Sequence, residues 1–348
     1  MALPFFGQNG MNSVLLRAVL PDFAILLPHP MSHLAPPRIV QLSPDQEDLG
    51  LRLCLRSLEP AQFDQQVAAL RASVQRQPLS GYRVLGAFRG EVLTGAMLIQ
   101  TQPGRTAAVW LPRLVAGEPP KTARQLLLQG IDDLPRPAFR MVQSLLPPDA
   151  GTDAQLLVDA GFRRVSDLLY LVCLADQFPP SPPCAELQFQ PYVATLHARF
   201  AQLVDATYEG SLDCPAVNGV RSTDDVLQGY RATGCFAPER WLIARHQGEE
   251  VGCLILTDYP EHATWELIYM GILPAARGHG RGVEMVRHAQ WLCGQALGKR
   301  LVLGVDAANE PALRMYATAG FQAWDRTSVY IRILDETGST GLEGKTLS

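Results

Sequence analysis

The C-terminal half of the chain alternates between strand-like and helix-like spacing of its apolar residues. Its first part predicts a strand at 186–191, helices at about 194–208 and 222–233, and strands at 240–246, 251–258 and 264–273. Its second part predicts a helix at about 281–298, an apolar strand at 301–305, a helix at 310–319 and final strands. Strands that are antiparallel first and parallel later, mixed with helices, indicate a three-layer α/β/α sandwich.

The segment 281–298 has a clear helical period. Its apolar positions recur every three or four residues and so share one face: Val283, Val286, Ala289, Cys293, and Ala296 or Leu297. We therefore expect this helix to bury one stripe of side chains against a sheet.

The N-terminal half repeats the same order of elements. Residues 82–100 and 240–258 each read as a strand, a glycine-containing turn and a second strand. Each half later carries a short helix that ends in A-G-F, at 159–162 and 318–321, where glycine suits the positive φ of a helix C-cap. This agreement predicts an α/β chain of two tandem domains with mixed sheets and one common fold.

Length and composition agree with two domains. The chain has 348 residues, of which 47% are apolar, enough for two cores of ordinary size. Four prolines in FPPSPPC, from residue 178 to 184, break any helix or central strand. We expect an N-terminal extension at 1–37 that is disordered or precedes the true start, a domain at 38–177, a proline-rich linker at 178–185, a domain at 186–334 and a flexible tail at 335–348.

Charge and cysteine content indicate which partners and which cellular compartment to expect. The formal net charge is −4, and no basic block is typical of nucleic-acid or membrane binding. The apolar stretch at 12–28 is interrupted by Pro21 and Asp22, is too short to span a bilayer, and lacks the features of a signal peptide. Seven cysteines without a C-x-x-C pair predict neither disulfides nor a zinc site, and they favour the cytoplasm.

The segment 271–288, GILPAARGHGRGVEMVRH, carries the clearest chemical signal. A strand ends near Leu273, a short loop holds several glycines, and an amphipathic helix starts at once. Glycines let backbone N–H groups converge and the helix N-terminus adds partial positive charge, so the loop predicts a site for a pyrophosphate. Its G-x-G-x-G spacing differs from the dinucleotide fingerprint, and no Walker Gly-Lys-Ser/Thr follows. A tight structural turn is the alternative.

At this loop the sequence resembles the GNAT superfamily of N-acetyltransferases. Residues 277–282, RGHGRG, match the family signature R-x-x-G-x-G/A, and residues 309–321, NEPALRMYATAGF, match its later motif. Among family members, the tandem layout resembles that of mycothiol synthase. The resemblance implies that acetyl-CoA is bound by the following residues: Gly271, Ile272, Leu273, Arg277, Gly278, His279, Gly280, Arg281, Gly282, Asn309 and Tyr316.

The resemblance also implies how an amine attacks the thioester. Glu266 stands where family members carry a general base, and an ordinary strand glutamate is the alternative. Asp258 and Glu261 are the other acids nearby. A backbone N–H near 271–273, where the family's fourth strand splays open, is expected to bind the oxyanion.

The later motif implies the remaining roles. Tyr316 matches the tyrosine that protonates the leaving thiolate, since a phenol of ordinary pKa stays protonated at neutral pH. A packing role for its ring is the alternative. Asn309 is expected to cap the following helix and to contact the cofactor. His279 lies at a variable position of the loop signature, so we expect its side chain to be a solvent-facing spacer.

The N-terminal half lacks these residues. Its counterpart of the phosphate loop, VAGEPPKTA at 115–123, contains no R-x-x-G-x-G. Alignment of the two A-G-F motifs places Leu157 opposite Tyr316 and Ala150 opposite Asn309. We therefore expect a degenerate GNAT-like domain without catalysis, packed against the active half.

Together these features predict an enzyme, an N-acetyltransferase of the GNAT type. It is expected to transfer an acetyl group from acetyl-CoA to a primary amine by direct attack through a tetrahedral intermediate, without a metal. The acceptor is expected to be a small-molecule or peptide amine, and the excess of acids over bases in 205–235 favours a cationic one. The alternatives are an acyltransferase that uses another acyl-CoA and a CoA-binding regulatory protein without catalysis.

Overall fold

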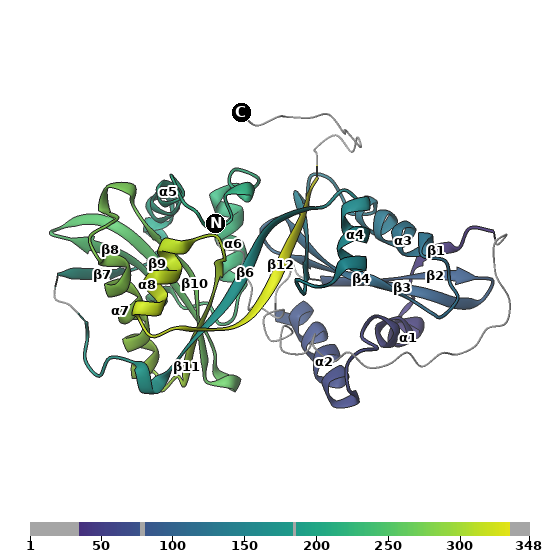
Figure 1. The fold of residues 1–348 in the computed structure, drawn as a ribbon, viewed down its shortest axis with the longest axis horizontal. Helices are drawn as coiled ribbons and strands as arrows, with labels where there is room; N and C mark the ends of the chain where they lie inside the picture. Colours follow the sequence, from purple (N-terminus) through teal and green to yellow (C-terminus); the bar gives the residue numbers. More distant parts are fainter. Residues whose placement is uncertain (1–34, 77–80, 184–185, 335–348) are drawn as a thin grey trace.

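The computed structural model describes residues 35–76, 81–183 and 186–334. They form one mixed sheet of twelve strands with helices on both faces (Figure 1). The strand order is β1-β2-β3-β4-β5-β12-β6-β11-β10-β9-β8-β7. The α/β class and the layering expected from the sequence are confirmed. Most of the predicted extension and the whole predicted tail lie outside the described residues.

The N-terminal lobe contains the first five strands and the first four helices. Its strands are β1 (Arg38–Gln41), β2 (Gly81–Arg89), β3 (Val92–Gln102), β4 (Thr106–Leu114) and β5 (Met141–Leu146). Its helices are α1 (Pro44–Cys54), α2 (Pro60–Arg76), α3 (Lys121–Asp132) and α4 (Gly151–Asp159). The first four strands are antiparallel, and β4 pairs with β5 in parallel.

The C-terminal lobe repeats this arrangement. Its strands are β7 (Leu187–Pro191), β8 (Trp241–His246), β9 (Glu249–Tyr259), β10 (Thr264–Ile272) and β11 (Arg300–Asp306). Its helices are α5 (His197–Thr207), α6 (Thr223–Arg231), α7 (Arg281–Gln295) and α8 (Glu310–Thr318). Here β10 and β11 form the parallel pair, in the place that β4 and β5 take in the other lobe.

The two remaining strands are exchanged between the lobes. β6 (Arg163–Leu174) ends the N-terminal half of the sequence, yet it pairs with β11 of the C-terminal lobe from Arg300↔Leu174 to Asp306↔Leu168. β12 (Gln322–Ile333) ends the C-terminal half, yet it pairs with β5. The strands also pair with each other and cross the molecule diagonally between the lobes (Figure 1). The last strand of each half therefore completes the sheet of the other half.

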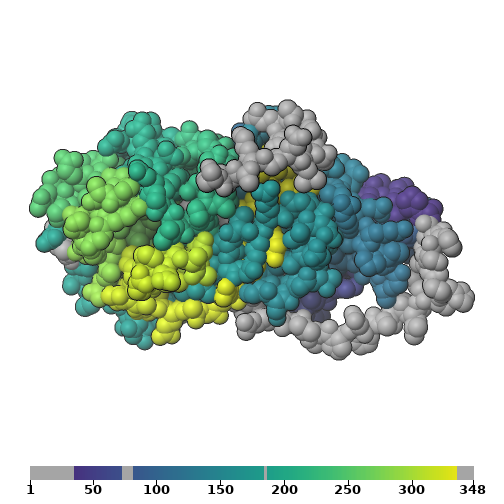
Figure 2. Space-filling model, turned by 45° about the horizontal axis from the view of Figure 1, so that its top comes forward, coloured from purple at the N-terminus to yellow at the C-terminus, as the bar shows by residue number. Residues whose placement is uncertain are grey.

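Apolar packing follows the same exchange. Each lobe has one apolar core on each face of the sheet, under α1 and α2, α3 and α4, α5 and α6, and α7 and α8. Along β12, Val329 and Ile331 join the core under α5 and α6, whereas Tyr330 joins the core under α3 and α4. Because successive strand residues point to opposite faces, one strand ties the two lobes together. In the space-filling view, yellow atoms from the end of the chain lie among teal atoms of the N-terminal half (Figure 2).

The predicted stripe of α7 is confirmed in its middle and wrong at its end. Val286, Ala289 and Cys293 are buried, and Val283 is half-buried. The helix ends at Gln295, however, and both Ala296 and Leu297 are exposed. Leu297 adopts a positive φ of 59°, which turns the chain out of the helix and toward β11. Because of this left-handed backbone conformation, Leu297 does not continue the buried face of α7.

The exchange predicts that the lobes stay together without a covalent link. A protease recognition site can be inserted in the linker, residues 178–185. After cleavage at this site, we expect the two fragments to elute from a native size-exclusion column as one species. The reason is that β6 of the first fragment pairs with β11 and β12 of the second, and β12 pairs with β5. Separation of the fragments should require denaturant. Two folded fragments that separate in native buffer would show that the exchanged pairing is wrong.

Candidate functional site

The strands β10 and β11 pair only at one end. Their parallel register covers Thr264↔Arg300, Trp265↔Leu301 and Glu266↔Val302. Beyond this point β10 continues along β9 to Ile272↔Gly252, and β11 continues along β6 to Asp306. The two strands therefore diverge into a split. Glu266 is the last residue of β10 that pairs with β11.

Backbone groups of β10 point into this split. The Leu273 N–H donates to the carbonyl oxygen of Val251 at 2.9 Å, so Leu273 faces β9. Strand residues alternate in direction, and the N–H and C=O of Ile272 therefore face the open edge. In agreement, the Ile272 carbonyl oxygen accepts a hydrogen bond from Arg277 Nε at 3.0 Å rather than from β9. Ile272 thus offers a strand-edge N–H at the site expected for an oxyanion.

Glu266 is buried at the closed end of the split. Its side chain is 2% exposed, and its Oε2 accepts a hydrogen bond from the Tyr259 hydroxyl at 2.7 Å. Its β10 neighbour Ile268, in the same alternation, packs in the core under α5 and α6. The carboxylate therefore belongs to the face of the sheet that α5 and α6 cover. Of the other acids considered, Asp258 pairs with Arg240, and Glu261 is exposed.

The glycine loop has the backbone conformation that its sequence predicts. Gly278 and Gly280 have φ values of 81° and 76°, and Gly280 is the N-cap of α7. A Cβ atom at either position would meet nothing within 4 Å, so the loop backbone is open to an approaching group. At Gly282 a Cβ would clash with Met315 Sδ, so the absence of a side chain here lets Met315 of α8 pack closely against α7. His279 is exposed between the two open glycines.

The two arginines of the loop are engaged with the protein itself. Arg277 donates to the carbonyl oxygens of Thr207 at 2.9 Å and Gly210 at 3.2 Å, besides that of Ile272. Thr207 is the last residue of α5, so the guanidinium lies at the negative end of that helix. Arg281 donates to the Ala276 carbonyl at 3.1 Å. Both side chains hold the loop in place, and the open glycines leave the backbone to face a ligand.

The later motif forms the start of α8. Asn309 is its N-cap, and its Oδ1 accepts a hydrogen bond from the Ala312 N–H at 3.3 Å. Tyr316 is 8% exposed and its ring packs edge-on against Phe321, with centroids 5.6 Å apart, in the core under α7 and α8. Burial, and then the charge of Asp213, raise the pKa of Tyr316 above its ordinary value. The phenol therefore remains a proton donor at neutral pH.

Asp213 joins the loop after α5 to the end of β11. Its Oδ1 accepts a hydrogen bond from the Asp306 N–H at 3.1 Å, and Asp306 Oδ2 accepts one from the Cys214 N–H at 3.1 Å. The charge of Asp213 raises the pKa of two phenols that lie on opposite faces of the sheet, those of Tyr316 and Tyr269. Within 205–235, no sequence pattern distinguishes Asp213 from the other acids.

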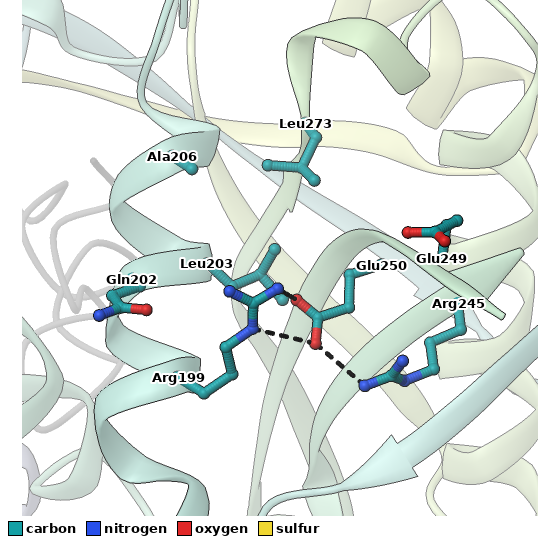
Figure 3. A pocket seen from close by; sticks show the side chains of 8 residues that line it. All are labelled: Arg199, Gln202, Leu203, Ala206, Arg245, Glu249, Glu250 and Leu273. Carbon is teal, nitrogen blue, oxygen red and sulfur yellow. Dashed lines mark hydrogen bonds and ion pairs between the residues drawn. The ribbon is translucent and has the colours of Figure 1, made fainter.

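A cavity of about 460 Å³ lies beside the end of β10 (Figure 3). Its walls come from α5, from the β8–β9 hairpin and from the residue after β10: Arg199, Gln202, Leu203, Ala206, Arg245, Glu249, Glu250 and Leu273. Arg199 and Arg245 both pair with Glu250, at 2.7 and 3.0 Å. With two arginines and two glutamates, the wall is balanced in charge.

The N-terminal lobe has a split without these groups. β4 and β5 pair only from Thr106↔Met141 to Ala108↔Gln143, so Ala108 takes the place of Glu266. At the start of α3, where an anion would bind, the buried carboxylate of Glu118 accepts two hydrogen bonds from Arg89, at 2.8 and 2.9 Å. Burial alone would raise the pKa of Glu118, but the hydrogen bonds from Arg89 and Thr122 hold it below its usual range. An internal anion thus occupies this helix N-terminus.

Some site types are absent from the part of the chain that the structure describes. No group of three or more His, Cys, Asp or Glu side chains there is arranged to hold a metal ion. None of the described helices is both long and apolar enough to cross a membrane.

Residues 205–321 match the model of the acetyltransferase (GNAT) family. The mycothiol acetyltransferase of Paenarthrobacter aurescens (strain TC1) is 33% identical over 113 residues, which cover 30% of this chain and 34% of that protein. The chain thus matches about a third of the length of this curated relative.

Two solved structures share the fold over most of the chain. A GCN5-related N-acetyltransferase from Sphaerobacter thermophilus has a TM-score of 0.53 and 16% identity, with 85% of this chain and 95% of that chain covered. A glucosamine N-acetyltransferase region of a fungal multi-domain β-N-acetylglucosaminidase has a TM-score of 0.58 and 13% identity, with 86% and 38% covered. The alignment over both lobes agrees with two GNAT-like units in tandem.

The family match spans α5 to α8 and includes the split, the glycine loop and the later motif. The similarity to the acetyltransferase (GNAT) family therefore falls on the lobe that holds the split and the glycine loop.

Proposed function

We propose that the protein is an N-acetyltransferase that moves an acetyl group from acetyl-CoA to a primary amine. The observation that carries the proposal is the split between β10 and β11. A carboxylate, Glu266, lies on one face of the sheet, a phenol, Tyr316, belongs to the other, and a glycine loop opens at the wide end. A thioester and an amine that approach from opposite faces would meet in this gap.

The proposed binding of acetyl-CoA uses the backbone more than side chains. The first N–H groups of α7 and the open loop at Gly278 and Gly280 suit a pyrophosphate. The open edge of β10 at Met270, which faces the same way as Ile272 in the strand alternation, suits the amide groups of a pantetheine arm, which would pair with it as a strand does. Arg277 and Arg281 would hold this frame, and Asn309 would set the start of α8 beside it.

The proposed reaction proceeds through a tetrahedral intermediate. Glu266 takes a proton from the acceptor ammonium, directly or through water, and the neutral amine attacks the thioester carbonyl carbon. The oxyanion of the tetrahedral intermediate accepts a hydrogen bond from the Ile272 N–H. The C–S bond then breaks and Tyr316 gives its proton to the leaving sulfur. The positively charged nitrogen of the intermediate passes its extra proton, through water, to the Tyr316 oxygen, so that the products are an amide and a free thiol.

The two lobes would differ in role. We propose that residues 186–334 catalyse the reaction, and that residues 38–177 form a degenerate unit, because Ala108, Ala150 and Leu157 replace the base, the cap and the acid. The six described cysteines are free thiols, which favours a reducing, cytoplasmic setting. The second candidate, a CoA-binding protein without catalysis, would keep the loop but would need no buried Glu266.

Calorimetry tests the binding step. We expect one acetyl-CoA site per chain, and at least about tenfold weaker binding in a Gly278→Ala, Gly280→Ala variant, because each alanine would be strained at positive φ by about 1 kcal/mol. A Gly90→Ala, Gly117→Ala variant is the matched control. Those glycines also have positive φ and open space, but they lie in the N-terminal lobe. Two sites per chain, or equal losses in both variants, would contradict the proposal.

Kinetics test the assignment of the base. We expect Glu266→Gln to lower kcat/KM by about 10² to 10⁴, the usual contribution of a general base, and to leave the Kd of acetyl-CoA unchanged. The reaction is followed by release of the free thiol from acetyl-CoA in a screen of primary amines. Glu261→Gln serves as the control, because Glu261 is an exposed acid on the turn before β10. A larger loss in this control than in Glu266→Gln would move the base to the turn.

A further inference from the structure

Tyr259 and Glu266 form a hydrogen-bonded pair at the closed end of the split. The hydroxyl oxygen lies 2.7 Å from Glu266 Oε2. Burial, and then the charge of Glu266, raise the pKa of Tyr259 well above its ordinary value. The phenol therefore keeps its proton and is the donor, and the carboxylate is the acceptor.

The backbone fixes this pair. Tyr259 is the last residue of β9 and pairs with Thr264, while Glu266 pairs with Thr257, so the two side chains are diagonal neighbours across antiparallel strands. The connection between the strands is a short turn, Pro260–His262, followed by Ala263 at φ 45°. A tight turn of this kind leaves the end of β9 little freedom to move away from β10.

We propose that Tyr259 is a positioning residue of the acyl transfer, holding the Glu266 carboxylate in one orientation and stabilising its ionised form. This inference rests on the proposed function, in which Glu266 is the base. A hydrogen bond donated to a carboxylate favours the charged form. A base that sits 2% exposed needs such a donor to be ionised at neutral pH, because burial works in the opposite direction.

Other ionisable groups face the pair from each neighbouring element. Tyr170 on β6 lies within electrostatic range of Glu266, and Cys235 and Glu261 act on Tyr259. Tyr170 itself accepts a hydrogen bond from Thr327 of β12 at 3.2 Å. The same face of the sheet also carries these groups farther along the split: Asp213, Tyr230 and Tyr269. The Tyr259 hydroxyl donates its hydrogen bond directly to the carboxylate.

A titration of the unliganded, full-length protein tests the proposal without an acceptor. Carboxyl carbons of ¹³C-labelled glutamate are followed by NMR against pH, and the Glu266 signal is assigned by its loss in Glu266→Gln. We expect Tyr259→Phe to move the Glu266 midpoint up by about one pH unit, the usual size of the effect of one hydrogen bond on a carboxylate. An unchanged or lower midpoint would overturn the proposal.

A matched variant separates this effect from a general loss of packing. Tyr192→Phe also removes a hydroxyl from a buried tyrosine of the same core, where it contacts Arg231 and His197. We expect no movement of the Glu266 midpoint in this variant, and an equal shift in both would overturn the proposal. The two hypotheses fail separately: an active enzyme with an unmoved midpoint refutes the role of Tyr259, whereas a moved midpoint without acetyl-CoA binding refutes the proposed function.

Discussion

The pairing of β6 with β11 is the constraint on which the site depends. A strand that diverges from one neighbour loses the hydrogen bonds of that edge, so its place in the sheet depends on the hydrogen bonds of its other edge. β11 has only three residues paired with β10, and all seven of its residues pair with β6. The split can stay open because β6 holds β11 along its whole length. Since β6 belongs to the half without the GNAT motifs, that half is part of the structure of the half that carries them.

Burial of Glu266 is the second constraint, and it follows from the first. The closed end of the split is lined by strands on both sides, so a side chain there is shielded from water. A lone buried carboxylate would be neutral rather than ionised. The Tyr259 hydroxyl opposes that tendency, and the turn after β9 keeps it in place. The same enclosure that excludes water from the proposed reaction therefore requires a donor built into the adjacent strand.

The sequence predicted what depends on short-range pattern. The middle of the helical stripe of α7, the glycine turns at 278 and 280 and the capping by Asn309 are local properties, and each is found at its expected place. The stripe fails at Ala296 and Leu297, which lie beyond the end of the helix. The strand exchange was not predictable in this way, since β6 and β12 have the same alternating pattern whichever lobe they complete. Tyr259 was not predicted as a partner of Glu266 for a related reason. It became a partner of Glu266 only through the register of two strands, which depends on the turn between them.

The N-terminal lobe shows why shape alone does not make the site. It keeps a split of the same three-residue register, and β12 pairs with β5 along the whole of β5, from Met141 to Leu146. The same three-residue split therefore occurs in a lobe that has Ala108 in the place of Glu266. What differs is the occupancy of the helix N-terminus: Glu118, paired with Arg89, already supplies the negative charge that an incoming phosphate would bring. A second anion there would meet a buried carboxylate. In the C-terminal lobe the corresponding loop has open glycines instead, and this replacement separates a structural split from one able to receive a ligand.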